Sequence, residues 1–354
     1  MKVKMNPIFS IVSVNFNGGE KIIDSIKSVF KQIDISFEII VIDNGSVDGS
    51  YEKILAMASD KLKVIRLEKN FGFTVGANTG ANNAKGKYLL ILNNDAYLDG
   101  KDFLAKAALT LDNSDESVCG LFPKVVFNWE PSVLNSTFVV WHDRQMWYDP
   151  ENGFLDQKKL NPSHKEETRT VFGAMFVAPI FKTKLWLKVS GFDERFFTYA
   201  EDLDLSYRMN LLGYKYLYYP DIKVLHDFRS SSKDDSNPLW SYYYFQRNYL
   251  FVAIKNYELK NIFRKFPIYT VYFRSALISA IKNHDKPMLQ LLFRVISSLI
   301  GNMAYLLKKR SEIQGLRKKN DSEIWDYGFA LNFNPYYYNN KIVLNLNSIE
   351  TKND

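Results

Sequence analysis

Apolar and polar residues alternate along the first hundred positions in a pattern that predicts strands and helices in turn. Short apolar runs of strand length, each ending on polar residues, cover 9–15, 37–43, 64–67 and 88–92. Between them, apolar residues recur at helical spacing, which predicts helices over 18–31, 48–58 and 75–84. This order predicts an α/β fold with a doubly wound, mostly parallel sheet.

The pattern is more varied after residue 99. We expect helices at 99–111, at 182–189 and from about 201, and strands at 118–127, 171–179, 214–219 and 223–225. The region 128–167 has tryptophans and prolines among polar residues with no clean period, so we interpret it as a long insertion over the ligand edge of the sheet. Its aromatic residues suit either acceptor recognition or packing in a small satellite core.

Composition and charge narrow the class of protein. The only cysteine among 354 residues, Cys119, excludes an internal disulfide and cysteine-cluster zinc sites, which favours a cytoplasmic location. The apolar run 8–16 contains polar residues and lacks a cleavage site, so we expect a first strand rather than a signal peptide.

The basic charge is concentrated in the C-terminal third. The range 255–319 holds 14 Lys and Arg against three acids, about +11, so the rest of this +7 chain sums to about −4. Helical patterns cover 239–257, 262–282 and 287–307, and Arg294 interrupts the last apolar face. Because a charge inside this face disfavours a membrane span, we expect an interfacial helix on an anionic membrane. The alternative is packing on the catalytic domain or in a homo-oligomer. No nucleic-acid-binding module is evident.

Polar residues follow each of the first strands. Asn15, Asp43 and Asn44 end the first two, and Asn93, Asn94 and Asp95 end the strand that begins at Tyr88. In an open α/β sheet the carboxyl ends of the strands form the ligand edge, so a nucleotide is predicted there, with Asp43 accepting a hydrogen bond from a base or ribose. The chain has neither a dinucleotide-binding glycine motif nor a P-loop. Something else must therefore hold the phosphates of the predicted nucleotide, and a metal ion bound by Asp95 is the candidate. The alternative is an ordinary turn, because Asn and Asp are common turn residues.

Six sequence blocks over about residues 7–229 resemble glycosyltransferase family 2, and within it the rhamnosyltransferase-type enzymes of bacterial surface polysaccharides. These blocks are Ser10–Asn15, Val41–Ser46, Asn70–Phe73 with Asn78 and Gly80, Leu90–Asp95, Gly191–Glu194 and Glu201–Asp204. The resemblance implies a GT-A fold, a nucleotide-diphosphate sugar donor, a divalent cation and inversion at the anomeric carbon.

The resemblance also implies a set of site residues. Asp95 and His226 would hold the cation, and this mixed oxygen and nitrogen set suits Mn²⁺ better than Mg²⁺. Asn93 stands where the family often has Asp, which lowers the ligand charge. The residues expected to bind the donor, including Gly173 for the room it leaves beside the backbone, are Asn15, Asp43, Asn44, Phe73, Asn78, Asn94 and Gly173.

Two adjacent carboxylates are candidates for catalysis. Asp202 occupies the family's general-base position, and we expect the helix N-terminus and a nearby cation to lower its pKa. Glu201 is the second candidate, but Thr198 and Glu201 form a capping-box pattern, so Glu201 could instead fix the helix start. Asp204 and Arg208 are spaced as an ion pair on one helix face.

These observations predict three regions and one function. Residues 1–235 form a GT-A domain with halves at 1–112 and 113–235, followed by basic helices at 236–320 and a tail at 321–354. We expect transfer of rhamnose or a similar hexose to a glycan or lipid-linked glycan at the inner face of the cell membrane, in surface polysaccharide or O-antigen synthesis. The loop 230–236 could close over the donor. The alternative is a non-catalytic nucleotide-sugar or glycan-binding protein on the same scaffold.

Overall fold

The computed structural model describes residues 6–142, 146–149, 151–153, 155–156, 166–228 and 238–329. The first part alternates strands and helices as predicted: β1 (Phe9–Asn15), α1 (Lys21–Phe30), β2 (Phe37–Asp43), α2 (Ser50–Ala56), β3 (Leu62–Arg66), α3 (Phe73–Asn82) and β4 (Tyr88–Ile91). The next part consists of β5 (Ala96–Asp99), α4 (Phe103–Asp112), β6 (Val118–Phe127), β7 (Leu134–Ser136), β8 (Val140–His142), β9 (Met146–Tyr148), β10 (Arg169–Val171), β11 (Ile180–Lys182), α6 (Thr183–Lys188), a short 3₁₀ helix at Glu194–Phe196, α7 (Glu201–Leu211) and β12 (Lys215–His226).

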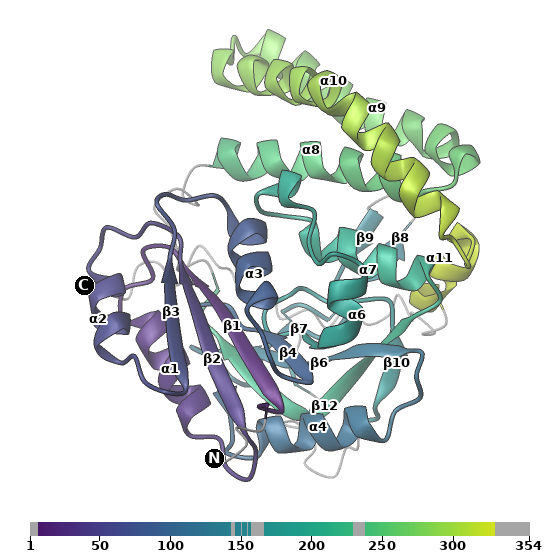
Figure 1. Cartoon of the computed structure of the whole chain (residues 1–354). Coiled ribbons are helices and arrows are strands. Elements are labelled where there is room, and N and C mark those ends of the chain that lie inside the picture. The colour runs from purple at the N-terminus through teal and green to yellow at the C-terminus, as the bar shows by residue number, and fades with distance from the viewer. Residues whose placement is uncertain are drawn as a thin grey trace.

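One large sheet organises the described part of the chain (Figure 1). Its order is β10-β12-β6-β11-β4-β1-β2-β3, with β5 added to β12 and β7 to β6. Strands β1 to β4 are parallel, β12 is parallel to β6, and β11 runs antiparallel between β4 and β6. The predicted α/β fold with a mostly parallel sheet is therefore confirmed.

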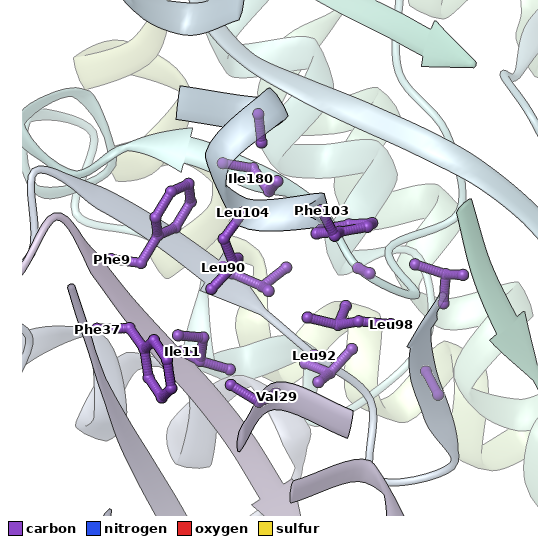
Figure 2. Packing of buried hydrophobic residues seen from close by; sticks show 14 of the residues in the cluster. Phe9, Ile11, Val29, Phe37, Leu90, Leu92, Leu98, Phe103, Leu104 and Ile180 are labelled. Carbon is purple, nitrogen blue, oxygen red and sulfur yellow. The ribbon is translucent and has the colours of Figure 1, made fainter. Parts of the chain in front are cut away.

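Helices cover both faces of this sheet. On one face, α1 and α4 pack against strand residues; Figure 2 shows Phe9, Leu90 and Leu104 in this core. On the other face, α3, α6 and α7 pack against Val12, Leu89 and their neighbours. Helix α3 approaches closely because it presents glycines: a Cβ atom on Gly80 would lie 2.3 Å from Cγ1 of Val12.

The C-terminal region is helical, as predicted, and it packs on the α/β part of the chain. Its elements are α8 (Pro238–Asn256), α9 (Leu259–Lys282), α10 (Lys286–Gly315) and α11 (Asp321–Phe329). Figure 1 shows α8 between the α/β part of the chain and the pair α9 and α10. Leu306, Ile324 and Trp325 share a buried core with Leu203 and Tyr207 of α7. Helix α11 therefore gives structure to the start of the segment that sequence reasoning left as a tail.

Three predictions of local structure are wrong. Of the strand expected at 171–179, only Val171 is in a strand, at the end of β10; the segment 172–179 is irregular and mostly buried, and β11 begins at Ile180. The two short strands expected after 214 are one long strand, β12. The chain also forms β5, which the pattern did not predict, and the helix expected from 99 begins at Phe103. The predicted closing loop 230–236 lies outside the described residues.

Candidate functional site

The carboxyl ends of β1 and β2 form a buried polar cluster. The Asn15 amide donates to Asp43 Oδ1 at 2.9 Å, to Ser46 Oγ at 3.0 Å and to Ser50 Oγ at 2.8 Å. Oδ2 of Asp43 accepts from the Ser46 N–H at 3.2 Å and lies 3.4 Å from Nε of Arg66. Both Asn15 and Asp43 are fully buried. The structure brings these two predicted residues together and adds Ser46 and Ser50, which sequence reasoning missed.

Asn44 shapes the neighbouring loop. Its amide donates to Asn70 Oδ1 and to the Gly72 carbonyl, both at 3.0 Å, and its Oδ1 accepts from the Phe71 N–H at 3.0 Å. Gly72 has φ +92°, and a Cβ atom there would lie 2.6 Å from the Phe197 carbonyl oxygen. The Asn44 side chain thus fixes the backbone of residues 70–72 next to Phe197.

Asn78 links helix α3 to the loop before α7. Its amide donates to the Phe192 carbonyl at 2.9 Å and to Glu194 at 3.1 Å, and its Oδ1 accepts from the Phe192 N–H at 2.9 Å. The ring of Phe73 lies 5.7 Å from that of Phe192. Phe73 and Asn78, which were predicted to bind the sugar donor, therefore connect α3 to the segment 192–194 before α7.

The two remaining residues predicted to bind the sugar donor, Asn94 and Gly173, lie where two parts of the chain pack closely. Asn94 is buried, and a Cβ atom on Gly18 would lie 2.9 Å from its amide nitrogen. A Cβ atom on Gly173 would lie 2.4 Å from Ser206 Oγ of α7. The missing side chain of Gly173 therefore leaves room for helix α7, in addition to any role toward a ligand.

The two predicted metal ligands meet at the ligand edge. Nε2 of His226 lies 3.2 Å from Oδ1 of Asp95, and both side chains are buried. Strand pairing causes this contact, because β12 runs antiparallel to β5 with His226 opposite Ala96. Asp227, the next residue, accepts from Tyr97 at 2.8 Å and fixes this end of β12.

Asn135 sets the orientation of the histidine. Its Oδ1 lies 2.8 Å from Nδ1 of His226, and because an amide oxygen only accepts hydrogen bonds, Nδ1 carries the proton that it receives. In the neutral ring, Nε2 then points its lone pair at the Asp95 carboxylate. A neutral ring of this tautomer offers its Nε2 lone pair beside a carboxylate oxygen, and a divalent metal ion binds both of these atom types.

The protein supplies only part of a coordination shell. Within the described ranges, no group of three or more His, Cys, Asp or Glu side chains is gathered as a ligand set. Asn93, the departure from the family motif, uses its backbone N–H to bond the Val177 carbonyl at 2.9 Å. A cation here would therefore take its other ligands from phosphate oxygens and water, as hard cations in substrate-phosphate sites do.

The candidate catalytic carboxylates begin helix α7. Helix α7 starts at Glu201, its N-cap Ala200 has φ +61°, and no side chain caps it. The capping-box interpretation of Glu201 is therefore wrong, because Glu201 is the first helical residue rather than the third. One oxygen of Glu201 is buried without a hydrogen-bond partner among the described residues.

Burial raises the pKa of both carboxyl groups. The pKa of Asp202 rises to about 6 because burial outweighs the hydrogen bonds from the Leu203 and Phe176 backbone. The pKa of Glu201 rises to about 8 through burial and the charge of Asp202. The expected lowering of the Asp202 pKa is wrong for the protein alone, because the helix N-terminus contributes less than desolvation costs.

The irregular segment 172–179 joins the carboxylates to the metal ligands. The Phe176 backbone hydrogen-bonds Asp202, and the Val177 carbonyl accepts from the Asn93 N–H beside Asp95. Through two adjacent residues, one short segment therefore contacts both Asp202 and the turn that carries Asp95.

Asp204 has a structural role. Its Oδ2 accepts from Nε of Arg208 at 2.8 Å, which confirms the predicted ion pair, and its Oδ1 lies 2.9 Å from Nζ of Lys255 on α8. Burial acts to raise the pKa of Asp204, but Lys255 and Arg208 lower it to about 2. This buried carboxylate fastens α7 to α8.

Comparison with known proteins finds a family model that matches part of the chain. Residues 10–179 match Glycosyl transferase family 2. The chain is 33% identical to the uncharacterized glycosyltransferase YfnE of Bacillus subtilis over 34% of this chain and 31% of that protein. It is 24% identical to the O-antigen biosynthesis protein RfbC of Myxococcus xanthus over 58% of this chain and 16% of that protein. The matched segments thus span less than a third of either relative.

A solved structure shares the fold. The crystal structure of GalNAc-T7 with UDP, GalNAc and Mn²⁺ is similar to this chain with a TM-score of 0.62 and 17% identity, over 92% of this chain and 57% of that chain. At this identity the similarity concerns the fold alone. The segment 10–179, just under half of this chain, is therefore similar to glycosyl transferase family 2, and the described residues share the GT-A fold of a solved glycosyltransferase structure.

Proposed function

We propose that this protein is an inverting glycosyltransferase of bacterial surface polysaccharide synthesis. The observation that carries the proposal is the pair Asp95 and His226 on one ligand edge with the buried carboxylates Glu201 and Asp202. The names of RfbC and of GalNAc-T7 with UDP, GalNAc and Mn²⁺ support polysaccharide synthesis and a nucleotide-sugar donor. We further propose rhamnose or a similar hexose as the sugar, on the residues that resemble rhamnosyltransferases.

The donor would lie along the carboxyl ends of β1, β2 and β4. Asn15 and Asp43 shape the nucleotide end, and the backbone after Asn44 lines it. Asp95 and His226 would hold Mn²⁺ or Mg²⁺ beside the diphosphate. When bound, such a cation offsets the charge of the diphosphate as it leaves. His226 is oriented for this by Asn135, and Asp95 by its place between β4 and β5.

Asp202 would act as the general base. The acceptor hydroxyl oxygen attacks the anomeric carbon, the bond from that carbon to the diphosphate oxygen breaks, and the hydroxyl proton moves to the Asp202 carboxylate. The nucleoside diphosphate leaves with the bonding electrons, so configuration at carbon inverts. A pKa near neutrality suits this step, because the group accepts a proton and remains mostly ionised above about pH 6.

The acceptor is proposed to be a glycan or lipid-linked glycan at an anionic membrane. Apolar side chains on α9 and α10 are exposed, with Phe293 at 71% and Ile300 at 69%. Of the described helices, α10 alone has the length and hydropathy of a span, with a mean hydropathy of 1.3 over 18 residues. Arg294 is exposed on this helix and lies over the Tyr243 ring, and a charge at this position favours interfacial binding over a membrane span. A second copy covering this face is the competing occupant.

The charge surplus at the surface is smaller than the sequence count. Lys255 pairs with Asp193 and Asp204, Arg310 donates to the carbonyls of Ile254 and Tyr257, and Arg317 pairs with Asp321. These three cations hold helices together. The remaining lysines and arginines are still in excess, so attraction to anionic lipid is retained in the proposal.

Purified protein with Mn²⁺ should hydrolyse or bind one of three donors: UDP-N-acetylglucosamine, GDP-mannose or dTDP-rhamnose. The measurements are nucleoside diphosphate release and the shift in melting temperature, with EDTA as the control. Release that needs Mn²⁺ and is lost in Asp202→Asn supports the transferase. Binding without any turnover, even with added membrane extract, would favour the non-catalytic binding protein.

A further inference from the structure

The backbone just before the catalytic carboxylates is strained. Phe197, Tyr199 and Ala200 have φ values of +67°, +65° and +61°, a region that residues with a Cβ atom rarely adopt. Residues with a Cβ atom keep this conformation only where surrounding contacts impose it. Helix α7 begins directly after this loop and has no side-chain cap. The direction of its first turn therefore depends on the loop 195–200.

Two adjacent residues of α8 supply those contacts. The amide nitrogen of Asn248 donates to the carbonyl oxygens of Phe196, Thr198 and Tyr199, at 3.1, 2.7 and 2.6 Å. Nη2 of Arg247 donates to the carbonyls of Arg195 and Phe196, both at 2.8 Å. Nε of Arg247 also donates to Asn248 Oδ1 at 2.9 Å.

This contact is buried and rigid. Asn248 is fully buried, and the guanidinium of Arg247 lies 4.8 Å from the Tyr244 ring centre and 5.2 Å from that of Phe251. On the opposite side, the Phe197 carbonyl accepts from the Thr74 N–H at 3.3 Å. The loop is thus held between α8 and the start of α3, where the donor is proposed to bind. Without the two α8 side chains, several buried carbonyls would lose their partners.

We propose that Arg247 and Asn248 are positioning residues for sugar transfer. They hold the loop 195–200 so that α7 starts with Glu201 and Asp202 at the ligand edge. Helix α8 is therefore part of the catalytic apparatus rather than a linker to the C-terminal helices. The inference rests on the proposed function, in which one of these carboxylates takes the acceptor proton.

The test compares Asn248→Ala with a matched control, Asn256→Ala. Asn256 lies on the same helix and is equally buried, but its amide donates at 2.9 Å to Asp204 inside α7 rather than to the loop. Both variants should melt earlier. Asn248→Ala should lower kcat roughly tenfold to a hundredfold, because a small misplacement of a catalytic group has an effect of that size, while the KM for the nucleotide sugar changes less than about threefold. Asn256→Ala should keep kcat within about threefold.

Hydrogen–deuterium exchange separates positioning from general loss of stability. In Asn248→Ala the amides of 197–203 should exchange faster while the β1 and β2 amides keep wild-type protection. In Asn256→Ala no such local change is expected at 197–199. Wild-type exchange and wild-type kcat in Asn248→Ala would overturn the proposal, and so would equal kcat losses in the two variants at equal loss of melting temperature.

A second variant covers failure of Asn248→Ala to fold. Arg247→Lys keeps the positive charge and one donor group, so it should fold, but an ammonium cannot reproduce the planar donor arrangement. Its kcat should fall less than that of Asn248→Ala, with faster exchange at 195–199. Full activity and wild-type exchange in Arg247→Lys would contradict the role of this residue.

A double variant distinguishes this inference from the assignment of the base. If Asn248 acts through Asp202, the double variant with Asp202→Asn should be no slower than Asp202→Asn alone. Multiplied losses would overturn the positioning role. If Asp202→Asn itself retains wild-type turnover, the proposed base is wrong, and the same cycle with Glu201→Gln decides whether Asn248 acts through the other carboxylate.

Discussion

Nε2 of His226 lies 3.2 Å from Oδ1 of Asp95, and the Nδ1–H of the same ring is fixed by Asn135. Neither contact is possible until β12 pairs with β5 and β7 pairs with β6. The proposed cation site therefore forms only in the folded domain, and three parts of the chain share in building it.

The first prediction concerns metal-dependent binding of UDP. Asp95→Ala should abolish the increase in UDP affinity that Mn²⁺ produces, because the charged ligand is lost. His226→Ala should reduce that increase less, since it removes one neutral ligand. Calorimetry of UDP with Mn²⁺ and with EDTA measures both, and GDP and dTDP serve if UDP does not bind. Full Mn²⁺ dependence in both variants would remove the proposed metal site.

The second prediction concerns Asn135. Asn135→Leu should weaken Mn²⁺ binding about tenfold to a hundredfold, the usual effect of losing the partner of a ligating histidine. The variant frees the His226 ring to adopt the other tautomer, which ¹⁵N shifts of labelled histidine report without any turnover. The control is Asn128→Leu, which removes a 2.7 Å bond to Asp227 but leaves the ring untouched. Equal losses in both variants would contradict a tautomer role for Asn135.

Sequence patterns predicted the elements in which packing has a regular period. Strands β1, β2 and β4 are buried runs that stop on polar residues, so their ends and the polar cluster of Asn15 and Asp43 followed from the pattern. The pair of Asp95 and His226 came from family resemblance, because strand pairing between β12 and β5 has no sequence signal. Their contact is confirmed, while their role as ligands stays a prediction.

Other features depended on distant contacts. The run 171–179 is apolar and predicts a strand, but most of it is irregular, since its backbone serves Asp202 and Asn93 instead of a neighbouring strand. The capping box failed because Asn248, far along the chain, holds the loop before α7 in a conformation that Phe, Tyr and Ala do not favour. Asn135 lies in the insertion, where no period indicated a site residue.

The third prediction concerns the exposed faces of α9 and α10. A Phe293→Gln and Ile300→Gln double variant should lose flotation with anionic vesicles but keep its melting temperature within about 2 °C, because both side chains are largely exposed. The matched control is Leu109→Gln on α4, which is 65% exposed and lies outside these helices. Flotation unaffected by the double variant, or by salt, would favour a second copy as the occupant, which ultracentrifugation would show.

The fourth prediction separates the two carboxylates. Asp202→Asn should lower kcat by roughly a hundredfold to ten-thousandfold with little change in donor affinity, because an amide cannot take the acceptor proton. Glu201→Gln should lose less activity, because Glu201 has a pKa of about 8 and is mostly protonated at neutral pH, so the amide changes its charge little. Initial rates with saturating donor measure both. A dead Glu201→Gln beside an active Asp202→Asn would exchange the two roles.

The fifth prediction follows from the direction of the carboxyl pKa shifts. The folded-state pKa of Asp202, about 6, lies above its ordinary value, so the folded protein binds a proton between about pH 6 and pH 4 that the unfolded chain does not. Stability therefore rises as pH falls through this window, and the charged carboxylate destabilises the fold most above pH 6. Asp202→Asn removes that charge without changing the shape of the side chain. In EDTA and without donor, it should melt above the wild type at pH 8, and the difference should shrink as pH falls toward 4. An Asp202→Asn variant that melts below the wild type at pH 8 would show that this carboxylate stabilises the fold. That result would contradict the proposal that Asp202 is a catalytic group whose charge destabilises the folded protein.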